Sequence, residues 1–493
     1  MNSLERSEQL IPETGLANVL AVDLDGSLIF TDLLYETFVR VVFKKPWLLF
    51  LAPFWILKGI AFTKSKLSRL GVPDIRNLPY NSDLINWLSE EKKKGRRLVL
   101  CTGSHISLAN KVSNELGIFD EVLATDDQTN LTGSKKATAL VEAYGEKNFS
   151  YVGNEKKDLK VWKKASSAVV VNSRPHLAER ASQHCLVEKS FEKSRPTLRV
   201  IFKAIRVHQW SKNALVFVPL LTAHKIFDLH LVMLTALSFL AFGLCASATY
   251  ILNDLSDLDS DREHWKKRYR PMASGALSIK LGVVLCSAML LCSIFIALAF
   301  LPLGFIVVLG SYTAITLGYS FWFKRLQTVD IVVLASLYTV RLFAGSAAVS
   351  VAPSFWLLSF SMFIFLCLAI VKRISEIMKK QDQDPTANKL SGRGYFISDL
   401  SVLMSLGSSS GMVAILVFAM YVNSPTTIEL YRSPMLLWAI CPIIGYWVIR
   451  VLVMTARGQI DEDPISFAIR DKRSWIAGAA AIAAVIAAWQ IKI

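Results

Sequence analysis

Hydrophobic residues are distributed unevenly along the chain, and the character of the pattern changes near residue 200. Before this point, short apolar runs alternate with amphipathic stretches, which predicts parallel strands covered by helices. After it, long apolar runs follow one another, and a run of about 20 apolar residues can cross a bilayer as a helix. The pattern therefore predicts an N-terminal α/β domain followed by an all-α polytopic membrane domain.

The α/β domain is expected over residues 18–190, after an N-terminal tail at 1–17. In parallel sheets of this kind, ligands bind at the carboxyl ends of the strands, so polar residues that follow a strand are candidates for a site. Strands are predicted at 18–22, 97–101, 149–152 and 168–171, and helices at 82–94 and 106–116.

One apolar segment, at 47–62, does not fit a soluble α/β domain. It is shorter than the roughly 20 residues of a spanning helix, it contains Pro53, and Lys44 and Lys45 precede it. Such a segment beside basic residues is typical of a hairpin that lies in the membrane interface. We therefore expect residues 30–80 to form a membrane-associated cap; a buried helix of a soluble cap is the alternative.

A basic connector at 191–206 leads into the membrane domain at 207–493, for which nine spans are predicted. The first residues of the chain lack the apolar core of a signal peptide, so the α/β domain is expected in the cytosol. With that orientation, Lys and Arg concentrate in the cytosolic loops, as the positive-inside rule requires. We expect a multi-pass protein of the inner (cytoplasmic) membrane whose active-site loops face the cytosol. The predicted spans are 210–226, 229–252, 278–299, 302–321, 329–350, 354–372, 399–421, 434–454 and 474–491.

Composition narrows the class of protein further. Apolar residues make up 53% of the chain and charged residues 19%, whereas soluble domains carry about 25% charged residues. The seven cysteines include no CxxC pair, so a disulfide framework and a zinc site are not expected. The net charge of +16 fits cytosolic loops and a phosphorylated substrate, and no nucleic-acid partner is expected. A wholly soluble enzyme and a disordered chain are excluded, and a homo-oligomer stays open.

A charged segment, YILNDLSDLDSDREHWKKRYRPMASG at 250–275, follows the second predicted span. Asn253, Asp257 and Asp261 recur every fourth residue and share one helix face, with Asp254 next to it. Carboxylates at this spacing repel each other unless a cation lies between them, and Mg²⁺ binds carboxylates together with phosphate oxygens. The basic residues that follow suit a polyanion. The segment therefore predicts a magnesium–pyrophosphate site; a solvated charged loop is the alternative.

This segment resembles the first aspartate motif of the UbiA-type intramembrane prenyltransferase superfamily, and nine spans match that fold. Over about residues 203–492, further blocks resemble its decaprenyl-phosphate phosphoribosyltransferase branch. These blocks are RVHQWSKN at 206–213, YSFWFKRLQTVDI at 319–331, KRISE at 372–376 and EDPI at 462–465.

The second acidic motif is where the chain departs from the superfamily. Aromatic prenyltransferases carry DxxxD there, whereas this chain has Asp330 followed by Leu334, with Lys324 and Arg325 before it. Fewer acids and more bases suit a reaction in which the pyrophosphate belongs to phosphoribosyl pyrophosphate and polyprenyl phosphate is the acceptor. The resemblance thus implies transfer of 5-phosphoribose to polyprenyl phosphate; a prenyl diphosphate donor with an aromatic acceptor is the alternative.

The resemblance assigns a catalytic Mg²⁺ to Asn253, Asp254, Asp257 and Asp261. The lipid phosphate that attacks the anomeric carbon is already an anion, so the protein's part is electrostatic positioning. Charged groups in or beside a membrane are costly and are candidates for function. The candidate substrate-binding residues are Arg206, Gln209, Lys212, Asn213, Asn253, Lys266, Lys267, Arg270, Tyr319, Lys324, Asp330, Tyr338, Arg341, Lys372, Arg373 and Glu376.

Asp23 and Asp25 follow the first predicted strand in the sequence VDLDGS. This sequence resembles the first motif of the haloacid dehalogenase-like phosphatases. The later motifs of that family are matched in order by LVLCTGS at 98–104, GSKKA at 133–137 and YVGNEKKD at 151–158. The departure is Asn154, where the family usually has an aspartate, and it weakens the expected metal site.

The resemblance to these phosphatases implies a role for each residue. Asp23 would attack phosphorus and form an aspartyl-phosphate. Asp25 would protonate the leaving alcohol and then activate water. Thr102 and Lys136 would hold the phosphoryl oxygens, with Lys136 better spaced from the following helix than Lys135.

One Mg²⁺ in each domain is therefore expected, the N-terminal one on Asp23, the backbone carbonyl of Asp25, and Asp158. Together the two domains predict a bifunctional membrane enzyme that makes polyprenyl-phosphoryl-5-phosphoribose and then removes the 5-phosphate. The alternatives are an inactive or regulatory phosphatase-like domain, a transporter with a fused phosphatase, and a structural membrane anchor.

Overall fold

The computed structural model describes residues 17–173, 175–192, 197–385, 388–390, 393–460 and 463–491. The chain divides into two compact units. The first contains residues 1–206 and 250–287, and the second contains residues 207–249 and 288–493. The segment with the aspartate motif therefore belongs to the same unit as the N-terminal α/β domain.

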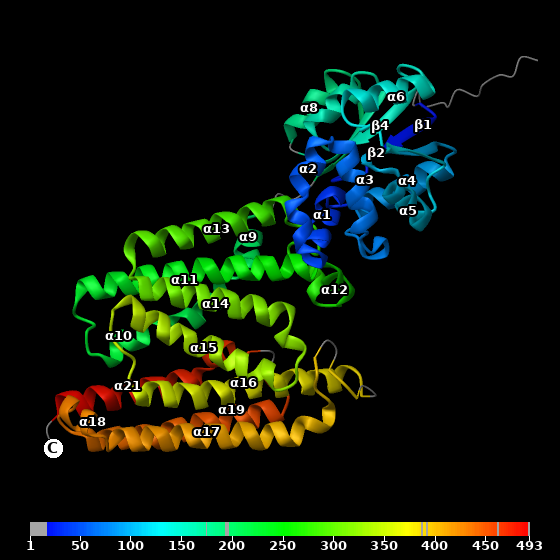
Figure 1. The fold of residues 1–493 in the computed structure, drawn as a ribbon. Helices are drawn as coiled ribbons and strands as arrows, with labels where there is room; N and C mark the ends of the chain where they lie inside the picture. The colour runs from blue at the N-terminus through cyan, green and yellow to red at the C-terminus, as the bar shows by residue number, and fades with distance from the viewer. Residues whose placement is uncertain are drawn as a thin grey trace, which may run out of the picture. The chain divides into compact units, whose positions relative to one another are not determined.

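A six-stranded parallel sheet forms the centre of the first unit, in the order β3-β2-β1-β4-β5-β6. Figure 1 labels β1, β2 and β4 of this sheet. The chain moves from β1 outward to β3 and then returns to place β4 on the other side of β1. The carboxyl end of β1 is thus the switch point at which such sheets bind ligands. The strands are β1 (Val19–Val22), β2 (Arg97–His105), β3 (Glu121–Thr125), β4 (Phe149–Gly153), β5 (Ser167–Ser173) and β6 (Leu186–Glu192).

Side chains of the strands point alternately to the two faces of the sheet and form a core on each. Leu20 and Val22 of β1 pack on one face and Ala21 packs on the other, and all three are fully buried. The predicted parallel α/β fold is confirmed, with β3 and β6 as additional edge strands. The helices of this unit are α1 (Leu33–Lys44), η1 (Pro46–Phe50), α2 (Ala52–Leu57), α3 (Ile60–Leu70), η2 (Ile75–Asn77), α4 (Ser82–Lys93), α5 (Ile106–Leu116), α6 (Ser134–Tyr144), η3 (Lys156–Asp158), α7 (Leu159–Trp162), α8 (Pro175–Ser182), α9 (Leu198–Ala204), α12 (Leu258–Glu263) and η5 (Lys267–Tyr269).

The predicted cap at 30–80 contains α1, η1, α2, α3 and η2. The apolar segment within it forms η1, α2 and the start of α3, and its side chains lie largely on the surface of the protein. The segment is therefore not a buried helix of a soluble cap. Its exposed apolar side chains, here called the cap patch, are Trp47, Phe50, Leu51, Phe54, Ile56, Leu57 and Ile60, which are 44–84% exposed.

A buried ion-pair cluster joins α1 to α12 within the first unit. Glu36 of α1 is fully buried, and its carboxylate accepts hydrogen bonds from Thr31 Oγ1 at 2.7 Å, Arg40 Nη1 at 2.5 Å and Arg262 Nη2 at 2.5 Å. Arg40 also donates to Asp259 of α12. Two carboxylates thus neutralise two guanidinium groups, as burial of charge requires.

We expect this cluster to make the stability of the folded protein depend on pH, with a loss of stability in acid. Burial alone would raise the pKa of Glu36, but Arg262 and Arg40 outweigh it and lower the pKa to about 2. A carboxyl whose pKa is lowered in the folded state stabilises that state above its unfolded pKa, and the contribution disappears as pH falls toward the folded pKa. The shift corresponds to about 3 kcal/mol.

Thermal unfolding of the full-length protein, measured between about pH 6 and pH 3, tests this expectation. The difference in stability between wild type and Glu36→Gln should shrink as the pH falls, because the glutamine does not titrate. A difference that stays constant over this range would show that Glu36 is not held ionised by its arginine partners.

Seven helices among the described residues are long and apolar enough to cross a membrane. Two of them, α11 and α13, extend from the second unit into the first, and in the second unit α16 packs against both α15 and α17. The seven spans are Leu229–Ser256 (α11), Ile279–Phe300 (α13), Leu303–Phe321 (α14), Val329–Ala348 (α15), Phe355–Gln383 (α16), Ile397–Val422 (η7, Ile397–Asp399, with α17, Leu400–Val422) and Pro434–Ala456 (η8, Pro434–Ala439, with α19, Ile440–Ala456). The shorter elements are η4 (Val207–Phe217), α10 (Val218–Thr222), η6 (Phe323–Arg325), α18 (Pro425–Leu430), α20 (Pro464–Arg470) and α21 (Lys472–Gln490).

The prediction of nine spans is not confirmed. The segment predicted as the first span forms η4 and α10, because Lys212 and Asn213 are buried beside polar partners and Pro219 begins a short helix. The segment predicted as the last span does form a helix, the 19-residue α21. It begins with Lys472 and Arg473 and is rich in alanine, which makes it less apolar than the seven.

Candidate functional site

The first candidate site lies at the carboxyl end of β1, where Asp23 and Asp25 follow the strand. Lys136 of α6 places its Nζ 2.7 Å from Asp23 Oδ1 and 2.9 Å from Tyr151 Oη. Asp23, Lys136 and Tyr151 are all buried. Two of the predicted site residues, Asp23 and Lys136, are therefore in direct contact, and the Asp23 carboxyl group lies beside a cation.

Asp25 is held by groups from two elements. Its Oδ1 accepts a hydrogen bond from the Leu33 backbone N–H at 2.9 Å, and its Oδ2 accepts one from Ser104 Oγ at 2.7 Å. Thr102 Oγ1 lies 3.4 Å from the same Oδ2, so Thr102, which lies within β2, is beside Asp25. Ser104 was not predicted, although it stands in the LVLCTGS block beside Thr102.

Asp158 is held from the backbone of the loop before it. Its Oδ2 accepts hydrogen bonds from the N–H groups of Asn154 at 2.9 Å and Glu155 at 2.8 Å. The side-chain Oδ1 of Asn154 is buried, and among the described residues it has no hydrogen-bond partner. A Cβ atom on Gly26 would lie 2.2 Å from the Asn154 side chain, and Gly26 has a φ of +77°, so glycine is required there.

This site carries more negative than positive charge. Burial raises the pKa of Asp23 to about 7, Lys136 opposes the increase, and Asp158 and Asp25 add to it. Burial also raises the pKa of Asp25 to about 6, with Asp32 adding to the effect. Excess buried carboxylate, together with the orphaned carbonyl oxygen of Asn154, suits a divalent cation with oxygen ligands.

The predicted ligand sets are nevertheless not assembled as metal centres. Within the described ranges, no group of three or more His, Cys, Asp or Glu side chains is arranged to hold a metal ion. In the second candidate site, the aspartate motif, arginine side chains stand between the carboxylates instead.

The aspartate motif spans the end of α11 and all of α12. Its helical course continues across the junction, because Asp257 N–H donates to the Asn253 carbonyl at 3.0 Å and Asp261 N–H donates to the Asp257 carbonyl at 2.8 Å. Asn253 Nδ2 also donates to Asp257 Oδ2 at 3.2 Å. The predicted helical spacing of these three residues is thus present.

Two predicted substrate-binding arginines neutralise this motif. Arg270 Nη1 lies 3.1 Å from Asp254 Oδ1 and 2.7 Å from Asp261 Oδ2, and Arg206 donates to the same Asp254 Oδ1. Arg206 has a φ of +51°, a left-handed conformation that is strained for a residue with a side chain. Asp254, Asp257 and Asp261 supply carboxylate oxygens, the ligands that Mg²⁺ prefers.

Two polar clusters lie in the second unit. In the first, Lys212 Nζ lies 2.6 Å from Asp463 Oδ2, and Tyr338 Oη donates to Asp463 Oδ1 at 3.4 Å. Arg341 Nε donates to Asn213 Oδ1 at 2.9 Å. Burial opposes ionisation of Asp463, but Lys212 and then Lys372 lower its pKa below the ordinary value. Asp463 was not predicted as a site residue, although the EDPI block contains it.

The second cluster surrounds Asp330, which is fully buried. Its Oδ2 lies 2.7 Å from Arg373 Nη2, and its Oδ1 accepts a hydrogen bond from Tyr395 Oη at 2.5 Å. Glu376 pairs with Arg373 and with Arg393. Asp330, Arg373 and Glu376 are thus brought together as predicted, and Arg393 and Tyr395 are additional members.

The remaining predicted substrate-binding residues differ in exposure. Tyr319 accepts a hydrogen bond from Arg393 Nη1 at 3.1 Å and so joins the Asp330 cluster. Lys266 and Lys267 lie exposed on the surface, and Gln209, Lys324 and Lys372 are half-buried.

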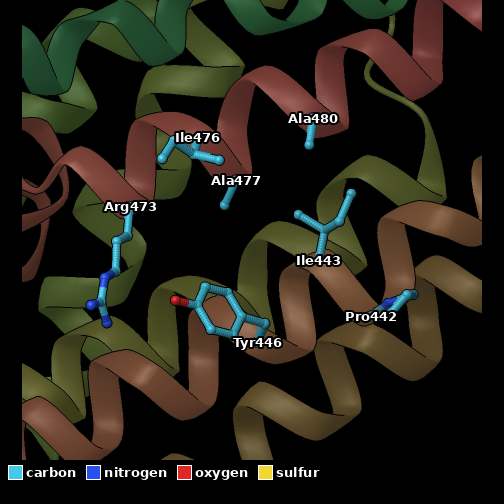
Figure 2. A pocket seen from close by; sticks show the side chains of 7 residues that line it. All are labelled: Pro442, Ile443, Tyr446, Arg473, Ile476, Ala477 and Ala480. Atoms are coloured by element: carbon cyan, nitrogen blue, oxygen red, sulfur yellow. The ribbon is translucent and has the colours of Figure 1, made fainter.

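A groove of about 520 Å³ on the second unit has a different chemistry. It lies between α19 and α21, and Figure 2 shows the side chains that line it. Its lining is almost entirely apolar and includes none of the predicted site residues, so it suits hydrocarbon rather than a phosphorylated substrate. The lining residues are Pro442, Ile443, Tyr446, Arg473, Ile476, Ala477 and Ala480.

Comparison with known proteins places these clusters in a family. Residues 214–475 match the model of the UbiA prenyltransferase family. The chain belongs to the UbiA prenyltransferase family. The first resemblance read from the sequence is thereby confirmed, and the whole aspartate motif, the Asp330 cluster and Lys372 lie within the matched residues.

Two relatives extend the comparison. The "Uncharacterized protein y4nM" of Sinorhizobium fredii is 34% identical over 473 residues, which cover 95% of this chain and 90% of that protein. The decaprenyl-phosphate phosphoribosyltransferase of Corynebacterium glutamicum is 37% identical over 183 residues, which cover 36% of this chain and 54% of that enzyme. The chain thus matches about half the length of the latter.

Two solved structures are similar to separate parts of the chain. A UbiA homolog from Archaeoglobus fulgidus, bound to GPP and Mg²⁺, covers 58% of this chain and 99% of its own, with 16% identity and a TM-score of 0.41. A HAD family hydrolase from Salmonella enterica serovar Typhi covers 36% of this chain and 68% of its own, with 13% identity and a TM-score of 0.28.

Proposed function

We propose that this UbiA-family protein is a bifunctional enzyme of lipid ribosylation. It transfers 5-phosphoribose from phosphoribosyl pyrophosphate to a polyprenyl phosphate, and its N-terminal domain then removes the 5-phosphate. The observation that carries the choice of donor is the surroundings of Asp330, which pairs with the buried Arg373 while Arg393 Nη1 lies 3.6 Å from its Oδ2. Leu334 stands four residues after Asp330, where a second aspartate would be needed to hold another metal–pyrophosphate, so the second polar cluster suits a substrate other than a prenyl diphosphate.

In the transfer step, an oxygen of the lipid phosphate forms a bond to the anomeric carbon as the bond from that carbon to pyrophosphate breaks. Mg²⁺ held by Asp254, Asp257 and Asp261 would neutralise the leaving pyrophosphate. Arg206 and Arg270 now neutralise those carboxylates, and guanidinium groups bind phosphate oxygens equally well. These arginines would therefore also supply positive charge to the pyrophosphate.

In the hydrolytic step, an Asp23 carboxylate oxygen attacks phosphorus and the bond to the ribose 5-oxygen breaks. Asp25 gives its proton to that oxygen and afterwards takes one from the water that attacks phosphorus, while the bond between phosphorus and Asp23 breaks and inorganic phosphate leaves. The contacts of Asp25 with Leu33 N–H and Ser104 Oγ fix its orientation. Lys136 and Thr102 hold the phosphoryl oxygens, and Asp23, the Asp25 carbonyl and Asp158 would hold Mg²⁺.

The test uses full-length protein in detergent with Mg²⁺, labelled phosphoribosyl pyrophosphate and a polyprenyl phosphate, with lipid products followed by mass spectrometry. The proposal expects the phosphoribosyl lipid first and the ribosyl lipid later. A phosphoribosyl lipid that accumulates without loss of phosphate would refute the hydrolytic step alone. Absence of both lipids, with turnover of a prenyl diphosphate and an aromatic acceptor, would refute the choice of donor.

The cap patch fits the surface of a bilayer. Lys44, Lys45 and Lys58 border its exposed apolar side chains, and basic residues beside an apolar surface bind anionic lipid headgroups. A cap that rests on the membrane would bring a lipid-borne phosphate to Asp23, whereas a soluble substrate gains nothing from it.

We expect Phe54→Glu with Leu57→Glu to lower hydrolysis of the phosphoribosyl lipid at least about tenfold, because loss of even one buried apolar side chain costs roughly 1.5–3 kcal/mol and about 1.4 kcal/mol is a factor of ten. Hydrolysis of a small soluble phosphate ester should not change. Leu186→Glu is the matched control, since Leu186 is 65% exposed in the same unit but lies on β6. Equal losses on both substrates would show that the cap patch does not serve membrane contact.

A further inference from the structure

The ion-pair cluster between α1 and α12 connects the cap of the phosphatase-like domain with the helix that carries candidate transferase residues. Helix α12 has six residues, and a helix this short is not stable by itself in water. Its position must therefore come from tertiary contacts. Asp257 directly precedes α12 and Asp261 lies within it, so the groups that hold α12 also place these two carboxylates.

Arg262 is the centre of these contacts. Its Nη2 and Nη1 donate to the two carboxylate oxygens of Glu36 at 2.5 and 3.2 Å, and its Nε donates to the Ala273 carbonyl at 3.1 Å. Ala273 follows Arg270 by three residues, and Arg270 pairs with Asp261. A single guanidinium therefore ties α1, α12 and the Arg270 loop together.

A second contact, made by close packing, joins the residues just before α1 to the loop that follows Arg270. A Cβ atom on Gly275 would lie 2.4 Å from Phe30 Cβ, and Gly275 has a φ of +73°, so a larger residue does not fit. Thr31 follows Phe30 and donates to Glu36 at 2.7 Å. The Thr31 carbonyl also accepts a hydrogen bond from Gly26 N–H at 3.1 Å, in the loop after Asp23. The start of the cap thus contacts both the nucleophile loop and the segment of the aspartate motif.

We propose that Glu36 is a positioning residue of the transferase, which holds the aspartate motif in place through Arg262; this rests on the transfer reaction proposed above. The phosphatase-like domain is then a structural part of the transferase. Its presence on the same chain serves the first reaction as well as the second.

Removal of the Glu36 charge has a defined consequence within this cluster. Arg40 keeps Asp259 as its carboxylate partner, whereas Arg262 keeps the Ala273 carbonyl but has lost its carboxylate partner. A buried guanidinium without a carboxylate is costly, which lowers the stability of the single variant. In both variants α12 loses its Glu36–Arg262 ion pair with α1, so Asp257 and Asp261 are no longer held in place.

The experiment compares full-length wild type, Glu36→Gln, and the double variant Glu36→Gln/Arg262→Met in detergent. The single variant leaves one guanidinium unpaired, and the double variant removes that charge while the Arg40–Asp259 pair stays balanced. We expect thermal stability to fall in the single variant and to recover in the double variant. The apparent KM for Mg²⁺ in transfer should rise about 10- to 100-fold in both, the range for residues that orient metal ligands.

Binding of Mn²⁺ in the presence of inorganic pyrophosphate, measured by electron paramagnetic resonance, tests the metal site without requiring the transfer reaction. All proteins in this assay carry Asp158→Asn, which silences the metal site of the phosphatase-like domain. Affinity should fall by the same factor in both Glu36 variants. If wild type binds Mn²⁺ and pyrophosphate but makes no ribosylated lipid, the proposed function fails. The positioning role is still tested by the Mn²⁺ affinities of the variants.

Glu188→Gln is the matched control, because Glu188 is 11% exposed and pairs with the buried Arg96 elsewhere in the first unit. It should reduce stability without weakening Mn²⁺ binding. The proposal is overturned if the double variant recovers Mn²⁺ affinity along with stability, or if Glu188→Gln weakens binding as much as Glu36→Gln. It is also overturned if wild type binds no Mn²⁺.

Discussion

Asp261→Asn is expected to slow ribosylation of the lipid about 10²- to 10³-fold, the range seen when one group that stabilises transition-state charge is removed. Asp261 is 2% exposed and lies 2.7 Å from Arg270. The amide keeps the shape of the side chain but not its charge, so the proposed Mg²⁺ loses an anionic ligand while Arg270 keeps Asp254 as a partner. The measurement is the initial rate of phosphoribosyl-lipid formation across a Mg²⁺ titration.

Glu263→Gln is the control for this variant, because it removes one negative charge from an exposed position on the same short helix. It should leave the transfer rate near that of wild type. Hydrolysis of a small phosphate ester by the same preparations reports whether the first unit is folded, and Asp261→Asn should retain it. A wild-type transfer rate in Asp261→Asn would remove Asp261 from the metal site.

The central strands could be predicted from the sequence, and the edge strands could not. Central parallel strands are covered on both faces and read as continuous apolar runs, as VLAV of β1 does. Strand β6 (LVEKSFE) alternates exposed and half-buried residues and contains acidic and basic side chains. Its place at the edge of the sheet comes from pairing with β5, which no local pattern contains.

The first predicted span was also wrong because its polar residues have partners that are distant in the sequence. Lys212 and Asn213 interrupt the apolar segment at 210–226, and in the structure both side chains are buried. Lys212 pairs with Asp463, which lies some 250 residues later in the chain. A sequence window contains one partner of such a pair and not the other, so it shows an apolar run with two polar residues.

The candidate sites were predictable where a motif carries its own chemistry. Asp23 and Lys136 each stand in a recognisable block, and the structure joins them. Glu36, by contrast, lies in the first turn of an amphipathic helix, where an acidic residue is ordinary. Its full burial depends on Arg262, which comes from a segment more than two hundred residues away, and so no sequence signal marks it.

Asp23→Asn is expected to stop the lipid product at the phosphoribosyl stage, with hydrolysis reduced at least about 10³-fold, as for removal of a catalytic nucleophile. An amide does not attack phosphorus as a carboxylate does. Lys136 should stay in place, because Tyr151 Oη accepts its second hydrogen bond at 2.9 Å. Mass spectrometry of the lipid products over time measures the change, and the rate of transfer should match wild type.

Asp83→Asn is the control, since Asp83 lies exposed in the first turn of α4 in the same unit and should leave both steps unchanged. Formation of ribosyl lipid by Asp23→Asn would show that another group performs the hydrolysis. The two variants also complement each other, because Asp261→Asn keeps a working phosphatase and Asp23→Asn keeps a working transferase. Mixed in the same vesicles, they should yield ribosyl lipid if the intermediate leaves one chain and reaches another through the bilayer. If the mixture stops at the phosphoribosyl lipid, the intermediate passes only between the two sites of a single chain.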